Sequence, residues 1–260
     1  MDLDLTGKRA LVCGSSQGIG RAISEELAGL GCEITLLARN EEKLRQLASE
    51  LPEKSKARYI ACDVANKEDL KEKVSKELQS HGPFAILINN SGGPPAGPIE
   101  FAKPEAFQKA LDQHLFTNIM LSQLLLAGMK EAGFGRIVNI ISTSVKAPLA
   151  GLGVSNTTRS AVANWAKTLS MEVASAGVTV NSVLPGATDT TRLSEIIANK
   201  AEKQNKSYET VEKKMLAEIP AGRFGDPKEV AAMAAFLCTK AAAYINGTAI
   251  AVDGGRTGCL

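Results

Sequence analysis

Short apolar segments alternate with longer helix-like stretches, and this alternation continues almost to the C-terminus of the chain. Such alternation is typical of a parallel sheet whose strands are joined by crossover helices. The segments are rich in Val, Ile and Leu, as strands covered by helices on both faces should be. The seven predicted strands are residues 9–13, 33–38, 57–62, 84–88, 136–141, 178–184 and 248–252.

Helices are predicted between these strands, and several have clear ends. Pro227 suits the first turn of a helix with Asp226 as its cap, while Gly31, Gly133 and Gly177 follow predicted helix ends. We find no internal repeat, low-complexity tract or linker, so residues 1–260 are predicted to form a single domain. The predicted helices are residues 19–30, 41–50, 67–80, 104–132, 154–176 and 227–240.

One irregular region, residues 187–225, separates the sixth predicted strand from the last predicted helix. It is polar and rich in Thr, Lys and Glu, and its mixed charges are typical of the solvated face of one or two helices. Ligands of α/β proteins bind beyond the carboxyl ends of the strands. Residues 187–225 are therefore also a candidate substrate lid.

The charge balance is close to neutral, since 30 basic and 28 acidic residues among 260 give a net charge of +2. This disfavours a nucleic-acid partner bound by bulk charge. The longest apolar run, residues 230–238, is far shorter than the roughly 20 residues that span a bilayer, and the N-terminus is acidic. We expect a cytoplasmic protein without a membrane partner. Its five scattered cysteines predict reduced thiols and no metal site.

A glycine-rich turn joins the first predicted strand to the first predicted helix. Glycines in that position allow a tight turn and let a pyrophosphate approach the backbone N–H groups at a helix N-terminus. The turn therefore predicts a dinucleotide site, and a merely structural turn is the alternative. Its residues are Gly14, Ser15, Ser16, Gln17, Gly18, Ile19 and Gly20.

The end of the second predicted strand bears on which dinucleotide is bound. An acidic residue there would accept the ribose 2′-hydroxyl, whereas a basic residue accommodates a 2′-phosphate. This chain has no acid at that point and has Arg39, which favours NADP(H) over NAD(H). Ser15 and Ser16 are candidate phosphate donors. The alternative for Arg39 is an exposed cation at a helix start.

With these features the chain resembles the short-chain dehydrogenase/reductase family over essentially its whole length. The resemblance implies a doubly wound, Rossmann-type α/β fold with helices on both faces of the sheet. Within this family the chain most resembles the 3-oxoacyl thioester reductases. The residues that carry it are Gly14 to Gly20, Cys62-Asp63-Val64, Asn89-Asn90-Ser91-Gly92, Asn118, Ser142, Pro185-Gly186 and Val252-Asp253-Gly254-Gly255.

The resemblance also implies roles for single residues. Asp63 and Val64 would hold the adenine, while Ser142 and Asn118 would belong to the catalytic group. The other implied cofactor-binding residues are Asn90, Ser91, Gly92, Pro185, Gly186 and Thr188.

The chain departs from the family at its Tyr-x-x-x-Lys pair, expected about 13 residues beyond the serine. Those positions hold Ser155 and Arg159. A serine hydroxyl is a much weaker acid than a phenol of pKa about 10, and it is shorter. Arg159 keeps the positive charge and can still donate to a ribose hydroxyl. Cofactor binding should therefore survive the replacements better than catalysis.

Three other residues could supply the proton. Lys146 lies in the loop after the fifth predicted strand and is either a proton donor or a surface lysine. His114 lies four residues before Asn118 and could feed a water relay, or it is a satisfied helix histidine. Tyr208 could move into the site with the lid and supply the proton, or it is a packing residue within residues 187–225.

Three functions remain open at this point. The first is an atypical NADP(H)-dependent ketoreductase of 3-oxoacyl thioesters or similar small carbonyl substrates. It would use Ser142 to polarise the carbonyl and Arg159 to fix the ribose, with water or Lys146 as proton source. The second is a cofactor-binding pseudoenzyme or regulatory subunit. The third is a lyase or isomerase.

Two long predicted helices, residues 104–132 and 154–176, carry more apolar surface than one sheet face needs. Ala161, Val162, Trp165 and Leu169 are spaced as on one helix face. In the resembled family such helices pair between subunits, which implies a homodimer or homotetramer. Packing of Trp165 in its own core is the alternative.

Overall fold

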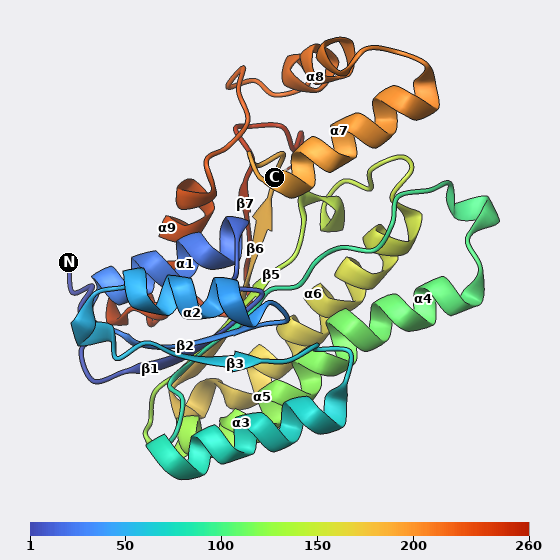
Figure 1. Cartoon of the computed structure of the whole chain (residues 1–260). Helices are drawn as coiled ribbons and strands as arrows, with labels where there is room; N and C mark the ends of the chain where they lie inside the picture. The colour runs from blue at the N-terminus through green and yellow to red at the C-terminus, as the bar shows by residue number, and fades with distance from the viewer. Residues whose placement is uncertain (260) are drawn as a thin grey trace.

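Seven parallel strands form one sheet in the order β3-β2-β1-β4-β5-β6-β7 in a computed structural model, which describes residues 1–259 (Figure 1). The strand order reverses between β1 and β4, which is where doubly wound sheets place their ligands. All seven predicted strands and the doubly wound α/β class are confirmed. The strands are β1 (Arg9–Cys13), β2 (Glu33–Ala38), β3 (Arg58–Ala61), β4 (Ile86–Asn89), β5 (Gly135–Ile140), β6 (Val178–Pro185) and β7 (Ala249–Val252).

Helices cover both faces of the sheet because successive strand side chains point to opposite sides. In β1, Ala10 and Val12 join the core under one helical layer, and Leu11 and Cys13 join the core under the other. The first layer consists of α1 (Gly18–Gly29), α2 (Glu41–Glu50) and α9 (Pro227–Cys238). The second layer consists of α3 (Lys67–His81), α5 (Thr117–Glu131) and α6 (Gly153–Val173).

The sequence signals at the helix ends act as predicted. The Asp226 carboxylate accepts from the N–H of Lys228, and Glu229 accepts from the N–H of Asp226, which completes a capping box for α9. Gly177 adopts a positive φ of 74° after α6 and the short turn that follows it. The chain therefore leaves these helices where the sequence indicates.

The long helix expected over residues 104–132 is not uniform. It consists of α4 (Pro104–Leu111), a π-helical segment (Asp112–Phe116) and α5. The Thr117 hydroxyl donates to the carbonyl of Asp112 at 3.0 Å and lies 3.1 Å from that of Val64. This side chain takes part in the wider turn, and π segments are frequent at functional sites.

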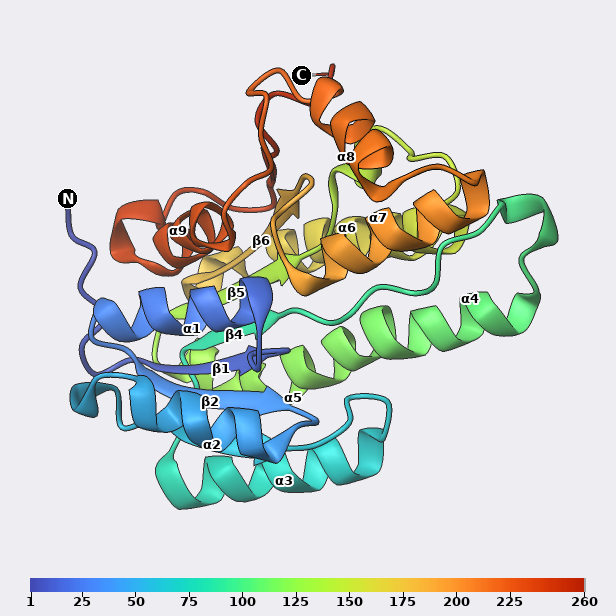
Figure 2. The ribbon, with the colours of Figure 1, turned by 45° about the horizontal axis from the view of Figure 1, so that its top comes forward.

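The polar region 187–225 forms two helices, α7 (Thr191–Gln204) and α8 (Tyr208–Ala217), which stand apart from the two helical layers (Figure 2). They have a small core of their own, made by Leu193, Ile197, Ala201, Val211 and Met215. The expectation of one or two solvated helices is thus correct. Tyr208 packs against this core.

Three further observations concern membrane-spanning helices, the cysteines and Trp165. Within residues 1–259, no helix is long and apolar enough to cross a membrane. All five cysteines are free; four are buried and Cys259 is exposed. Trp165 packs against the core of its own chain, which is the alternative interpretation for that residue.

Candidate functional site

The glycine-rich turn after β1 is built around Asn90, the first residue after β4. Its side-chain amide lies 3.3 Å from the carbonyl oxygens of both Cys13 and Gly14. A Cβ on Gly20 would overlap the Gly14 carbonyl oxygen and approach the Asn90 amide to 2.7 Å, so only glycine fits there. Gly14 and Gly18 adopt positive φ angles of 62° and 55°, which favour glycine. Gly20 thus lets the first turn of α1 pack directly on Gly14, and the glycine turn together with Asn90 forms a backbone cradle at the start of that helix.

The N-terminus of α1 opens into this cradle. Its N-cap, Gln17, makes no side-chain capping hydrogen bond, and the first turn carries no acidic residue. The first N–H groups of a helix need partners and favour an anion. This end of α1 therefore suits a pyrophosphate.

The two serines of the turn differ in position. Ser15 is fully buried, and its hydroxyl donates to the Leu37 carbonyl at 3.4 Å, so it ties the turn to β2. Ser16 is half-buried and lies nearer the surface. Of the two, Ser16 is the better placed for a phosphate.

Arg39 is exposed at the end of β2, and a second cation lies close by. Lys43, in the first turn of α2, donates from Nζ to the side-chain oxygen of Gln17 at 3.2 Å. Sequence reasoning missed Lys43, although its spacing of four residues from Arg39 is a usable signal. Together the two cations place positive charge beside the glycine turn.

The loop after β3 lies further along the same sheet edge. Asp63 is exposed and its carboxylate accepts from the N–H of Ala65 at 3.0 Å. Val64 is half-buried against the core, and its carbonyl oxygen lies 3.1 Å from the Thr117 hydroxyl. Both residues therefore lie after the carboxyl end of β3, on the same edge of the parallel sheet as the glycine turn.

Ser142 follows β5 and is half-buried. Its Oγ accepts a hydrogen bond from the N–H of Ser144 at 3.1 Å, which fixes the oxygen and leaves the hydroxyl hydrogen able to donate. Lys146 comes just after the short turn Thr143–Val145 and is half-buried. Ser142 is thus arranged as a hydrogen-bond donor toward the carboxyl edge of the sheet.

Asn118 belongs to a buried network of amides that the sequence did not reveal. Its Nδ2 lies 3.5 Å from Oδ1 of Asn139, and Asn89 donates to the same oxygen at 2.9 Å. Asn139 in turn donates to the carbonyl of Asn181 on β6 at 3.4 Å. The network joins β4, β5, β6 and α5 beneath the site. Three asparagines in central strands were the available signal, because buried polar groups need partners.

Ser155 and Arg159 are four residues apart on α6 and so lie on one side of that helix. Ser155 is half-buried, whereas Arg159 is only 8% exposed. The guanidinium donates from Nη1 to the carbonyl of Ile140 at 2.9 Å and from Nη2 to that of Ser91 at 3.3 Å. Burial lowers the pKa of Arg159 to about 10, so it stays charged at neutral pH. Arg159 therefore bridges the carboxyl ends of β4 and β5.

His114, in the π-helical segment, is almost fully buried, with 1% exposure. Its Nδ1 lies 2.6 Å from the hydroxyl oxygen of Ser91. Burial, and then the nearby charge of Arg159, lower the pKa of His114 to about 3, so the imidazole is neutral at pH 7. The structure thus brings His114, Ser91 and Arg159 together, a link between distant segments that the sequence did not indicate.

The loop after β6 closes the other side of the site. The N–H of Gly186 donates to the carbonyl of Val252, and a Cβ on Gly186 would approach that of Asp253 to 2.6 Å. Thr188 is buried, and its hydroxyl donates to the Gly186 carbonyl at 3.2 Å. Pro185 ends β6 beside this loop. The C-terminal motif at residues 252–255 thus packs against the Pro185-Gly186 turn and supports it.

The α7–α8 segment touches the site at two points. Arg192 donates to the carbonyl of Pro94 in the loop after β4 at 3.3 Å. Thr190, the cap of α7, lies against Gly18, where an added Cβ would meet its methyl group at 3.3 Å. Residues 187–225 therefore border the edge of the sheet as a lid would.

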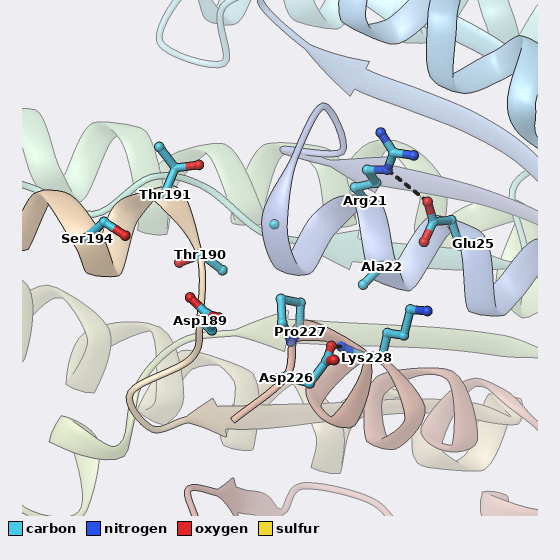
Figure 3. A pocket seen from close by; sticks show the side chains of 11 residues that line it. Arg21, Ala22, Glu25, Asp189, Thr190, Thr191, Ser194, Asp226, Pro227 and Lys228 are labelled. Atoms are coloured by element: carbon cyan, nitrogen blue, oxygen red, sulfur yellow. Dashed lines mark hydrogen bonds and ion pairs between the residues drawn. The ribbon is translucent and has the colours of Figure 1, made fainter. Parts of the chain in front are cut away.

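A hollow of about 560 Å³ lies behind the glycine turn (Figure 3). It is formed by the first turns of α1, the start of α7 and the start of α9, and Arg21 and Glu25 form an ion pair of 2.8 Å on its wall. The hollow shares Gly18 and Thr190 with the site and lies between α1, α7 and α9.

The fold and the glycine-rich turn after β1 define a Rossmann-type α/β protein with a cradle of the kind that suits a nucleotide. Known proteins show the same pattern. The family model described as enoyl-(acyl carrier protein) reductase matches residues 14–257. A 3-oxoacyl-[acyl-carrier-protein] reductase of Vibrio cholerae is 34% identical over 255 residues, which are 97% of this chain and 98% of the relative. The chain belongs to the short-chain dehydrogenase/reductase family.

Two solved structures are similar over nearly the whole chain. L-Sorbose reductase from Gluconobacter frateurii, complexed with NADPH and L-sorbose, has a TM-score of 0.93 and 32% identity and covers 100% of both chains. Actinorhodin polyketide ketoreductase with NADPH has a TM-score of 0.91 and 31% identity, covering 97% of this chain and 98% of that one. The matched members named here are reductases.

Proposed function

We propose that the protein is an NADP(H)-dependent reductase of small carbonyl compounds. The observation that carries the proposal is the backbone cradle formed by Gly14, Gly20 and Asn90 at the uncapped N-terminus of α1. A pyrophosphate would fit there. The cations of Arg39 and Lys43 beside the same turn favour a ribose 2′-phosphate, hence NADP(H) over NAD(H).

The remaining cofactor contacts follow the carboxyl edge of the sheet. Asp63 and Val64 would hold the adenine, and Arg159 would donate to the nicotinamide ribose through N–H groups that its two carbonyl bonds leave unused. The turn from Pro185 to Thr188 would line the nicotinamide. When bound, the reduced cofactor supplies a hydride.

The chain's own residues would then handle the carbonyl oxygen. Ser142 would donate its hydroxyl hydrogen to that oxygen, since its Oγ is already held by the Ser144 N–H. The alkoxide formed by hydride addition needs one proton to become the alcohol. Water or Lys146 would supply it, because Ser155 has no phenol to offer. Ser155 lies one helical turn before Arg159, where its hydroxyl would hold such a water.

The substrates proposed are 3-oxoacyl thioesters or similar ketones. The similarity to the Vibrio cholerae reductase and to the polyketide ketoreductase supports this class. The test is oxidation of NADPH by the pure protein with a short 3-oxoacyl thioester, with Ser142→Ala as control for a contaminating enzyme. Formation of the 3-hydroxy product by the natural protein alone supports the proposal.

A second candidate function is a cofactor-binding pseudoenzyme or regulatory subunit. Ser155 and Arg159 favour it, because positioned acid–base catalysis contributes about 10²- to 10⁴-fold in rate. Such a protein would bind NADPH as tightly as a reductase while forming no product.

The proposal extends to assembly and location. Large apolar side chains remain exposed on the second helical layer, with Met171 of α6 at 64% and Phe116 of the π-helical segment at 41%. Covering them in a homodimer or homotetramer would remove that surface from water. We propose such an assembly in the cytoplasm, and the mass of the protein in solution tests the assembly.

A further inference from the structure

Ser91 is held from two sides just beyond the end of β4. Its carbonyl accepts from Nη2 of Arg159 at 3.3 Å, and its hydroxyl lies 2.6 Å from Nδ1 of His114. The pairing of β4 with β5 ends at Asn89, so the sheet does not fix the backbone at Ser91. Two glycines, at positions 92 and 93, follow and add backbone freedom. The neighbours of Ser91 are also tied, since the Asn90 amide lies against the glycine turn and the Gly92 carbonyl accepts from Gln113 at 3.3 Å. The two side-chain contacts hold the carbonyl and hydroxyl of Ser91 itself.

The same contacts decide where the guanidinium of Arg159 lies. One of its two carbonyl acceptors, Ile140, is fixed by the regular pairing of β5 with β6. The other acceptor, Ser91, belongs to the loop. A planar fork held at two points has one orientation, whereas a fork held at one point can rotate. The orientation of Arg159 thus depends on how firmly Ser91 is held.

A histidine at position 114 would lower the stability of the fold if its only role were packing. Its Nε2 is buried and has no hydrogen-bond partner among residues 1–259, so the Ser91 contact is the polar anchor of the ring. A buried polar atom without a partner costs stability, and an apolar side chain would fill the same place without that cost. The histidine and serine together thus fit a positioning role better than a stabilising one.

We propose that Ser91 and His114 are positioning residues for Arg159, and that their hydrogen bond aims its guanidinium at the nicotinamide ribose. The neutral imidazole accepts the Ser91 hydroxyl hydrogen at Nδ1, and the Ser91 carbonyl holds Arg159. The inference rests on the proposed function for the ribose contact. The orientation of Arg159 is a property of the free protein and can be measured without any cofactor.

The experiment compares the natural protein with His114→Leu, His114→Asn and the double variant Ser91→Ala/His114→Leu. The asparagine variant keeps an acceptor oxygen near the position of Nδ1. Ser122→Ala is the matched control, because the buried Ser122 hydroxyl on α5 has no hydrogen-bond partner within residues 1–259, Arg159 included. Three quantities are measured: the melting temperature, the Kd of NADPH from its fluorescence, and the rate at which phenylglyoxal modifies Arg159 in the free protein, followed by peptide mass.

The double variant should melt at the natural temperature or above it, because both polar partners are replaced together. Its Kd for NADPH should nevertheless rise about five- to tenfold, the range expected when one hydrogen bond no longer aims a charged donor. Phenylglyoxal should modify Arg159 faster in the double variant and in His114→Leu. His114→Asn should restore most of the affinity for NADPH and most of the protection of Arg159 from phenylglyoxal. Ser122→Ala should match the natural protein in its Kd and in its modification rate.

An unchanged Kd and an unchanged modification rate in the double variant would overturn the proposal. A lowered melting temperature with unchanged Kd would also overturn it, since that is the result of a purely structural pair. If the natural protein itself fails to bind NADPH, the proposed function is wrong. The modification rate of Arg159 then decides the positioning role alone, with an unchanged rate against it.

Discussion

The guanidinium of Arg159 donates to the carbonyl of Ile140, the last residue of β5, at a distance of 2.9 Å. The Arg159 side chain reaches from α6 to the carboxyl end of β5, where it is buried and still charged at neutral pH. It therefore places a fixed cation at the carboxyl ends of β4 and β5, where the proposed nicotinamide ribose would lie. Cofactor binding can persist in this arrangement even though Ser155 offers no phenol.

Replacing Gly20 by alanine tests the cradle. The new Cβ would overlap the Gly14 carbonyl oxygen, so the variant should lose about 1–3 kcal/mol of stability and should not bind NADPH at concentrations that saturate the natural protein. Gly29→Ala on the same helix is the control, because no atom of residues 1–259 outside its own stretch of helix backbone lies within 4 Å of the added Cβ. That change should be neutral or stabilise by up to about 1 kcal/mol. Thermal melts and NADPH titration measure both effects, and normal NADPH binding by Gly20→Ala would contradict the cradle.

Cofactor preference should follow Arg39. Arg39→Glu removes a cation and adds an anion beside the proposed 2′-phosphate, so the Kd of NADPH should rise about tenfold or more while that of NADH changes little. Arg45→Glu, on α2 a short distance further along the chain, is the control for a general change of surface charge. Parallel titrations with both cofactors measure the ratio. An equal loss for NADPH and NADH in Arg39→Glu would refute the assignment.

The stability of the protein should depend on pH through His114. The pKa of His114 is about 3 in the folded chain and about 6.5 when unfolded, so the unfolded chain binds more protons between these values. The stability present above pH 6.5 is therefore lost as pH falls toward 3, by about 2 kcal/mol between pH 7 and pH 5.

Urea unfolding at the two pH values tests this dependence. His114→Asn should lack that part of the loss, and His81→Asn, at the exposed end of α3, controls for removal of an imidazole in general. Identical losses in the natural protein and in His114→Asn would show that His114 does not carry the effect.

The amide network beneath the site should be costly to break. Asn139→Leu would leave the side-chain amides of Asn89 and Asn118 without their common acceptor, and it should destabilise the protein by about 2–3 kcal/mol. Asn164→Leu, an exposed position on α6, is the control and should change stability by less than about 0.5 kcal/mol. Denaturant unfolding gives both values. A loss at Asn139 no larger than at Asn164 would mean that the network is not stabilising.

The sequence predicts the elements of this fold well because each depends on local chemistry. Apolar periodicity marks the seven strands, and residues such as Asp226, Pro227 and Gly177 mark the helix ends. The glycine turn is predictable for the same reason, since only glycine satisfies the geometry at Gly14 and Gly20.

Contacts between distant segments could not be predicted in the same way. Ser91 and His114 meet because the chain passes through a π-helical segment, which the apolar pattern of residues 104–132 does not reveal. The burial of Ser15 and the proximity of Lys43 to Gln17 likewise depend on how β1, β2 and α2 pack. Local patterns contain no information on such packing.

The most direct test of the account is NADPH turnover by the natural protein and by its Ser155→Tyr/Arg159→Lys variant, with the same 3-oxoacyl thioester. We predict that both bind NADPH and that the natural protein forms the 3-hydroxy product in a one-to-one ratio with NADPH oxidised. Turnover by the variant alone, with tight NADPH binding by both, would contradict the reductase assignment and favour a cofactor-binding pseudoenzyme.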